Sequence, residues 1–151
     1  MILFRFFLVS LQRFSIINAI ENQIMRTGEM ISKRNRALEK VYRRVIKSGR
    51  GVNFLSRKTI IELIKEQPAP RFYILPDTAK FFLLGLRKES ETNKGIVADL
   101  RENYNRLKAE NPDAKKEWLY ETVVLQPAKS FYMSDHRIEE VIFQYKGRNG
   151  K

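Results

Sequence analysis

A seven-residue segment that occurs twice constrains the fold of this chain more than any other feature. The sequence QPAPRFY at residues 67–73 recurs as QPAKSFY at residues 126–132, a displacement of 59. A recurrence at a fixed displacement indicates that one structural unit has been duplicated. The 151 residues are therefore predicted to contain two copies of one unit.

Apolar residues on either side of each segment have helical spacing. After the segments, the stripes at i, i+3, i+4 and i+7 are Ala79, Phe82, Leu83 and Leu86 in the first copy and Ile138, Val141, Ile142 and Tyr145 in the second. Before them, the stripe of Leu38, Val41, Tyr42, Val45 and Ile46 is matched, at a displacement of 62, by Leu100, Tyr104 and Leu107. Each stripe is typical of one face of an amphipathic helix.

Helix-boundary residues define a unit of three helices. Ser56 and Asp113 are predicted N-caps of the second helices. In the third helices, Pro76 is predicted in the first turn of one and Ser134 as the N-cap of the other. Pro68 and Pro127 should end the second helices, because proline lacks an N–H donor and pushes the preceding residue out of the α region. The predicted fold is all-α, a tandem duplication of a three-helix, helix-turn-helix-like unit.

Charge divides the chain more sharply than hydrophobicity does. We predict an N-terminal extension at 1–30, a basic three-helix unit at 31–88 and a near-neutral three-helix unit at 89–151. Their net charges are +1, +11 and 0, of a total of +12. An excess confined to one unit favours a polyanionic partner such as nucleic acid, although a solvated face with unmatched lysines is the alternative.

The first 30 residues allow two interpretations. Arg5 and Arg13 interrupt the apolar run, so no uncharged stretch is long enough to cross a bilayer, and no transmembrane span is expected. The segment is either an amphipathic helix that covers the core or a partner, or an over-extended reading frame whose true start is Met25 or Met30.

A helix-turn-helix would place the third helix of the first unit in the major groove, with the second helix behind it. Asp77, Thr78, Lys80 and Arg87 would then face DNA, with Arg71 in the turn beside a phosphate. Arginine and lysine on the remainder of the unit would hold the backbone without reading bases. The predicted nucleic-acid-binding residues are Lys33, Arg34, Arg36, Arg43, Arg44, Arg50, Arg57, Lys58, Arg71, Thr78, Lys80 and Arg87.

The repeated PA-x-x-FY element also has a purely structural interpretation. Its proline ends a helix, its small alanine permits close packing, and its aromatic residues fill the gap between the second and third helices. The residues concerned are Pro68, Ala69, Phe72, Tyr73, Pro127, Ala128, Phe131 and Tyr132. Ser130 replaces Arg71 and Glu139 replaces Lys80 in the second copy, so that copy should dimerise, bind protein or support the first.

Catalysis is not expected. The chain has no cysteine and a single histidine, His136, so neither a nucleophilic thiol nor a histidine-rich metal site can be assembled. The Gly49–Gly51 turn lacks the lysine and Ser/Thr spacing of a phosphate-binding loop. We predict no enzymatic activity, no cofactor and no metal.

The PAPRFY segment, together with the preceding Ile60, Ile61 and Ile64, resembles a family of small uncharacterised proteins of phages and mobile elements in gut bacteria. Those proteins carry a PA-x-RF-[YW]-x-S element after a short amphipathic helix. The resemblance covers residues 33–84 and, more weakly, 98–143; Leu75 stands where the serine is usual, and Ser130 where the arginine is. It implies a mobile-element setting and little about chemistry.

Two functions from different classes follow. The first is a regulatory or architectural DNA-binding protein, cytoplasmic in a bacterial host, with RNA as a lesser option. The second is a phage structural or assembly protein, virion-associated, with a basic surface toward the genome or a partner and with homo-oligomerisation through the second unit.

Overall fold

The computed structural model describes residues 2–48 and 55–144, and within them the regular secondary structure is all helix, as predicted. The elements are α1 (Ile2–Ser48), α2 (Arg57–Lys65), α3 (Pro76–Leu83), α4 (Lys94–Glu110), α5 (Lys116–Val123) and α6 (Asp135–Glu139), followed by a π-helical turn, η2 (Glu140–Gln144). The described residues form no strand, and one isolated β-bridge is their only extended pairing.

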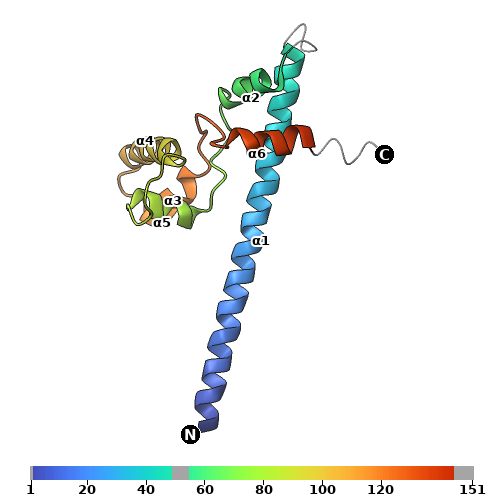
Figure 1. Cartoon of the computed structure of the whole chain (residues 1–151). Coiled ribbons are helices and arrows are strands. Elements are labelled where there is room, and N and C mark those ends of the chain that lie inside the picture. Colours follow the sequence, from blue (N-terminus) through green and yellow to red (C-terminus); the bar gives the residue numbers. More distant parts are fainter. Residues whose placement is uncertain (1, 49–54, 145–151) are drawn as a thin grey trace.

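The helices gather into two clusters (Figure 1). In one, α2 and η2 pack against the C-terminal part of α1, and α6 packs against α2. In the other, α3, α4 and α5 pack against one another. Buried apolar side chains run through both clusters as one continuous core, which includes Leu38, Ile64, Leu100 and Ile142.

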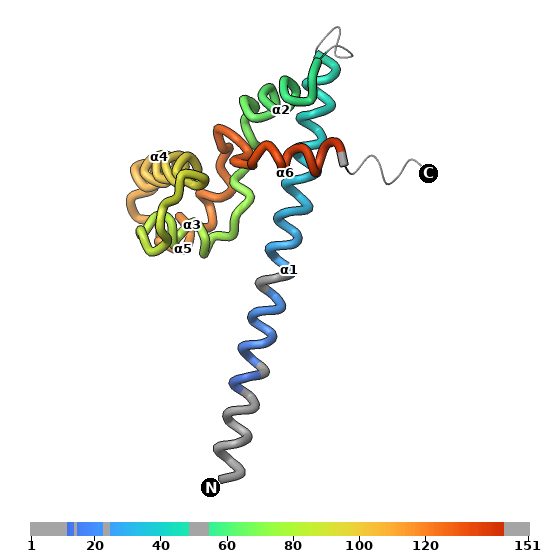
Figure 2. Tube along the Cα trace, in the orientation of Figure 1, coloured from blue at the N-terminus to red at the C-terminus, as the bar shows by residue number. Residues whose placement is uncertain are grey.

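The clusters do not coincide with the two stretches of sequence that carry the repeat. After α2 the chain crosses to the other cluster to form α3, and after α5 it crosses back to form α6 (Figure 2). Each cluster therefore contains two helices from one half of the chain and the third helix from the other half. The boundary between residues 88 and 89 stays a prediction. The helices do not pack in the two groups that this boundary would separate.

The repeated PA element lies where the two crossing segments meet. The Ala69 N–H donates to the Ala128 carbonyl over 2.9 Å, and the Ala128 N–H donates to the Ala69 carbonyl over 3.0 Å. Both alanines are 2% exposed, so the backbones approach with almost no side chain between them. The Phe72 N–H also donates to the Val124 carbonyl at the end of α5. The small residue of the motif is thus required by the crossing.

This packing corrects the helix-turn-helix interpretation. That motif needs the second and third helices to brace each other, with the third free to enter a groove. Here α3 packs against α4 and α5, while α2 packs against α1 and α6. Thr78 is half-buried, and Lys80 lies 5.9 Å from the centre of the Tyr120 ring of α5.

Several local signals act as predicted. The Ser56 and Ser134 hydroxyls accept from the backbone N–H groups of Thr59 and Arg137, and Pro76 occupies the first turn of α3. Asp113 was predicted wrongly: α5 begins at Lys116 behind Lys115, which makes no side-chain cap. Leu86, expected on a buried face, is 69% exposed because α3 ends at Leu83 before the left-handed Gly85 (φ 68°).

The first helix includes the N-terminal extension. Of the two interpretations of residues 1–30, one was an amphipathic helix, and α1 begins at Ile2; its N-terminal part projects away from both clusters (Figure 1). No proline occurs before Pro68, and only Gly28 interrupts the described helix with a poor helix former. Ile16, Ile17 and Ile20 are at least half exposed on the projecting part.

Candidate nucleic-acid interface

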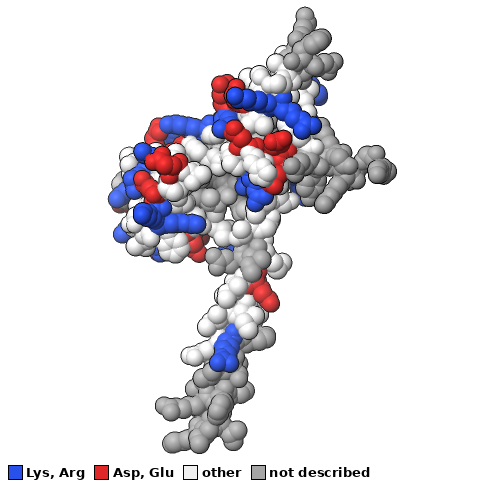
Figure 3. All heavy atoms as spheres, in the orientation of Figure 1, with Lys and Arg blue, Asp and Glu red and all other residues white. Residues whose placement is uncertain are grey.

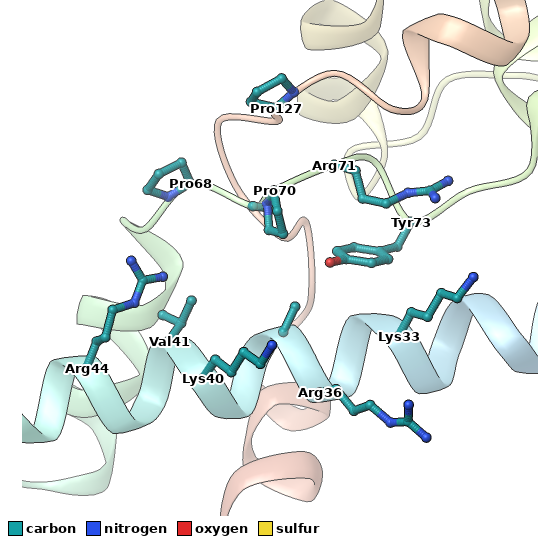
Figure 4. Close-up of a pocket in the computed structure, with 12 residues that line it drawn as sticks. Lys33, Arg36, Lys40, Val41, Arg44, Pro68, Pro70, Arg71, Tyr73 and Pro127 are labelled. Atoms are coloured by element: carbon teal, nitrogen blue, oxygen red, sulfur yellow. The ribbon is translucent and has the colours of Figure 1, made fainter.

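A groove of about 740 Å³ lies between α1 and the segment that leads from α2 to α3 (Figure 4). Its walls come from the two features that the sequence singled out, the basic first unit and the PA motif. The lining residues are Lys33, Arg36, Ala37, Lys40, Val41, Arg44, Pro68, Ala69, Pro70, Arg71, Tyr73 and Pro127.

Cationic side chains dominate the rim of the groove. Lys33, Arg36, Lys40 and Arg44 are spaced by three and four residues, which places them on one face of α1. Arg71 approaches from the opposite wall, and its Nε donates to the Phe72 carbonyl over 3.1 Å. No aspartate or glutamate lines the groove. The concentration of like charge favours an anionic ligand.

The groove cations are little neutralised by the protein itself. Lys33 pairs with Glu29 over 2.7 Å, and this contact lowers the pKa of the Glu29 carboxyl. Across the part of the chain that the structure describes, Arg36, Lys40, Arg44 and Arg71 form no ion pair. In the view of Figure 3, by contrast, basic and acidic side chains are interspersed over the helical clusters. The groove lining, in contrast, carries cations and no carboxylate.

Tyr73 supplies a neutral hydrogen-bonding group to the groove. Its ring stacks on Phe131 with centroids 6.1 Å apart and 6° between the planes, and Arg71 lies 5.9 Å from its centre. Burial raises the pKa of the Tyr73 phenol, so the hydroxyl keeps its proton at neutral pH. In Figure 4 this hydroxyl points toward the space between Pro70 and α1.

A different arrangement surrounds Tyr132, the second tyrosine of the repeat. The Asp99 carboxylate of α4, 3% exposed, accepts from the Tyr132 hydroxyl over 2.7 Å and from the Lys129 N–H over 2.8 Å. Its other oxygen accepts from the Asn103 amide over 2.9 Å. Burial, together with the hydrogen bond to Asp99, raises the pKa of the Tyr132 phenol far above its ordinary value. The carboxylate is thus fully engaged by groups of the protein.

The structure brings four of the predicted nucleic-acid-binding residues together in the groove: Lys33, Arg36, Arg44 and Arg71. The others lie elsewhere. Arg43 and Lys58 are exposed outside the groove lining, Arg87 lies over Phe82, and burial lowers the pKa of the half-buried Arg34. Arg57 lies over the Phe143 ring and 3.8 Å from Glu139. Arg50 lies outside the described residues.

Sequence reasoning missed Lys40. The signal was present, because Lys40 follows Arg36 by four residues and Lys33 by seven, so it had to share their helix face. Phe72, Phe131, Ala69 and Ala128, predicted as structural, are buried. Pro68 and Pro127 are exposed and line the groove, as does the half-buried Tyr73; Tyr132 is half-buried as well.

No group of three or more potential ligands that could hold a metal ion occurs within residues 2–48 and 55–144. Of the helices described, none is long and apolar enough to traverse a bilayer. Comparison of the sequence and structure with protein-family models, curated proteins and solved structures finds no match.

Proposed function

We propose that this chain is a non-enzymatic nucleic-acid-binding protein of a phage or mobile element, and that it binds DNA through the groove between α1 and the Pro68–Tyr73 segment. The observation that carries the proposal is the presence of five cationic residues, and of no carboxylate, in the lining of one groove. The phage setting rests on the sequence resemblance alone.

The groove chemistry suits a phosphate backbone. Arginine presents a planar fork of donors that matches phosphate oxygens, and lysine adds a compact charge. Four cations along one helix face form a row, which suits a linear polyanion better than a single small anion. Binding of this kind displaces condensed counterions from DNA, so its affinity falls steeply as salt rises.

We also infer that the chain is a tandem duplication whose two third helices are exchanged. The recurrence of the PA element at a displacement of 59 and the mutual hydrogen bonds of Ala69 and Ala128 support this. Duplication followed by divergence explains why one copy is basic and the other neutral: the copies share a scaffold while only the first keeps the cationic face.

Removal of two groove cations is expected to weaken DNA binding about tenfold in the double variant Arg36→Ala, Lys40→Ala. Each lost phosphate contact also lowers the slope of log affinity against log salt by about 1, so the slope should fall by about 2. Fluorescence anisotropy of the full chain with random-sequence duplex DNA at several salt concentrations measures both quantities.

The matched control is Lys108→Ala, Lys115→Ala, which removes two exposed positive charges from the second half of the chain. It should leave affinity and slope nearly unchanged. Equal losses of affinity in the two variants would show that net charge, and not the groove, accounts for the binding. A wild-type chain that shows no salt-dependent binding would refute the proposal.

The projecting part of α1 favours a second candidate function, that of an assembly protein. Ile17 and Ile20 are about half exposed on one face of a helix that leaves both clusters (Figure 1). The occupant we propose for this face is a second copy in antiparallel orientation. Centred on Ile17, that pairing sets Arg13 of each copy opposite Glu21 of the other, so charge complementarity favours it.

The variant Ile17→Glu, Ile20→Glu should convert this dimer to a monomer, because it places four carboxylates in the apolar seam. Sedimentation of the full chain measures the change. The control Ser15→Glu, Asn22→Glu adds the same charge on the opposite side of the helix and should stay dimeric. A wild-type chain that sediments as a monomer at high concentration would rule out the assembly role.

A further inference from the structure

Matched positions in the two halves of the chain differ at the groove. At the displacement of 62 that aligns the first helices, Ala37 corresponds to Asp99 and Val41 to Asn103. At the displacement of 59 that aligns the repeated motif, Pro70 corresponds to Lys129 and Tyr73 to Tyr132. The tyrosine is kept in both halves. In the second half the Asp99 carboxylate accepts from it and is itself held by the Asn103 amide, whereas apolar side chains stand at both matched positions of the first half.

In the second half, groups of the protein fill the space beside Tyr132. Asp99 accepts from the Tyr132 hydroxyl and from the Lys129 N–H, so its negative charge occupies the space beside the tyrosine. Lys129 in turn pairs with Glu102, and a Cβ on Gly95 would come within 3.2 Å of the Tyr132 ring. Tyr132 is therefore closely surrounded by groups of the protein.

In the first half, the corresponding space beside Tyr73 is open. Ala37 and Val41 line the groove floor and supply no acceptor, and Pro70 has no N–H. Within the described residues the Tyr73 hydroxyl forms no hydrogen bond with the protein, and it points toward the space between Pro70 and α1 (Figure 4). Arg36, Lys40 and Arg71 line the same space.

We propose that one phosphate group of the bound nucleic acid lies over Ala37 and accepts a hydrogen bond from the Tyr73 hydroxyl, in the place that the Asp99 carboxylate takes beside Tyr132. This inference rests on the proposed function and deepens it, because it identifies the anchoring phosphate site and a ligand-binding residue outside the cationic row. The second half carries its own anion, and the first half takes its anion from the ligand.

The chemistry of the site fits phosphate. The hydroxyl stays protonated at neutral pH and can donate to one phosphate oxygen, and arginine and lysine side chains belong to the lining of the same groove. Beside Tyr132 the Asp99 carboxylate accepts the tyrosine hydroxyl over 2.7 Å, so the matched half of the chain places an oxygen acceptor next to this hydroxyl. Removal of the aspartate in the first half leaves that anion to be supplied from outside.

Tyr73→Phe tests the donor without altering the ring. The variant keeps the stack on Phe131 and removes only the hydroxyl, so affinity for duplex DNA should fall about tenfold. The slope of log affinity against log salt should not change, because no cation is lost. Tyr132→Phe is the matched control, because it removes the hydroxyl that donates to Asp99. It should leave the affinity for duplex DNA unchanged, with folding verified by circular dichroism.

Ala37→Asp tests the place of the anion. The new carboxylate should occupy the phosphate position as Asp99 does beside Tyr132, and DNA affinity should fall by more than about tenfold. Asn18→Asp adds the same charge to α1 outside the groove, at an exposed position, and should have a much smaller effect. Equal losses from the two aspartates, or wild-type affinity in Tyr73→Phe, would overturn the inference.

Failure of this inference and failure of the proposed function have different signatures. If Arg36→Ala, Lys40→Ala weakens DNA binding but Tyr73→Phe and Ala37→Asp do not, the groove binds DNA and the phosphate site is refuted. Calorimetric titration of the wild-type chain with inorganic phosphate tests the opposite case. If the wild type binds phosphate but not DNA, and Tyr73→Phe abolishes that binding, the anion site stands and the nucleic-acid proposal falls.

Discussion

Phe72→Ala should lower the free energy of unfolding by about 4 kcal/mol. Phe72 is 1% exposed and is among the largest fully buried side chains of the described core. Its truncation removes apolar contacts and leaves a cavity that the surroundings can fill only in part. A typical domain is stable by ~5–15 kcal/mol, so the variant would retain a small margin or none.

Urea denaturation monitored by circular dichroism measures this loss as a lower midpoint. Phe81→Ala is the control of equal chemistry, because Phe81 is 46% exposed on α3 and its truncation should cost less than about 1 kcal/mol. Similar midpoints for the two alanine variants would contradict the central position of Phe72.

Asp99→Ala should cost about 3 kcal/mol, because it leaves the Tyr132 hydroxyl and the Lys129 N–H without their acceptor. Asp99→Asn keeps one acceptor oxygen and should cost less. Asp113→Ala, at an exposed position, should be nearly neutral. Denaturant midpoints of the three variants give the comparison.

A double-mutant cycle isolates the Tyr132 contact. Removal of the hydroxyl by Tyr132→Phe eliminates one of the stranded donors, so the double variant should be less destabilised than the sum of the single changes. Strict additivity would show that Asp99 acts without Tyr132 and would weaken the comparison drawn with Tyr73.

The helices could be predicted from the sequence because their signals are local. Ser56, Pro76 and Ser134 mark starts through their own backbone chemistry, and the stripe that contains Ala79 and Phe82 faces the core as expected. The first part of α1 was left between two interpretations, only one of them a helix, because it has apolar residues on several sides. Such a segment has no single buried stripe from which to recognise the helix.

The exchange of third helices could not be predicted. An apolar stripe indicates that a helix face is buried, but it does not identify the partner that buries it. The stripes of α3 and α6 are alike, so either helix satisfies the spacing in either cluster. The path of residues 66–75 and 124–134 determines which cluster each third helix joins. That path depends on the contact between Ala69 and Ala128.

The groove could be predicted only in part, because the sequence does not show which segments meet in space. Its cations were recognisable as a basic run, and most of them were named. That the PA motif would form the opposite wall, with Arg71 and Tyr73 facing α1, depends on where the crossing segments lie in space. The open place over Ala37 becomes visible only beside Asp99 in three dimensions.

The crossing also makes the two halves of the chain depend on each other. Because the third helix of each cluster comes from the other half of the chain, neither half of the sequence contains all the helices of either cluster. One wall of the groove is a crossing segment, so the position of that wall against α1 depends on the packing of both clusters.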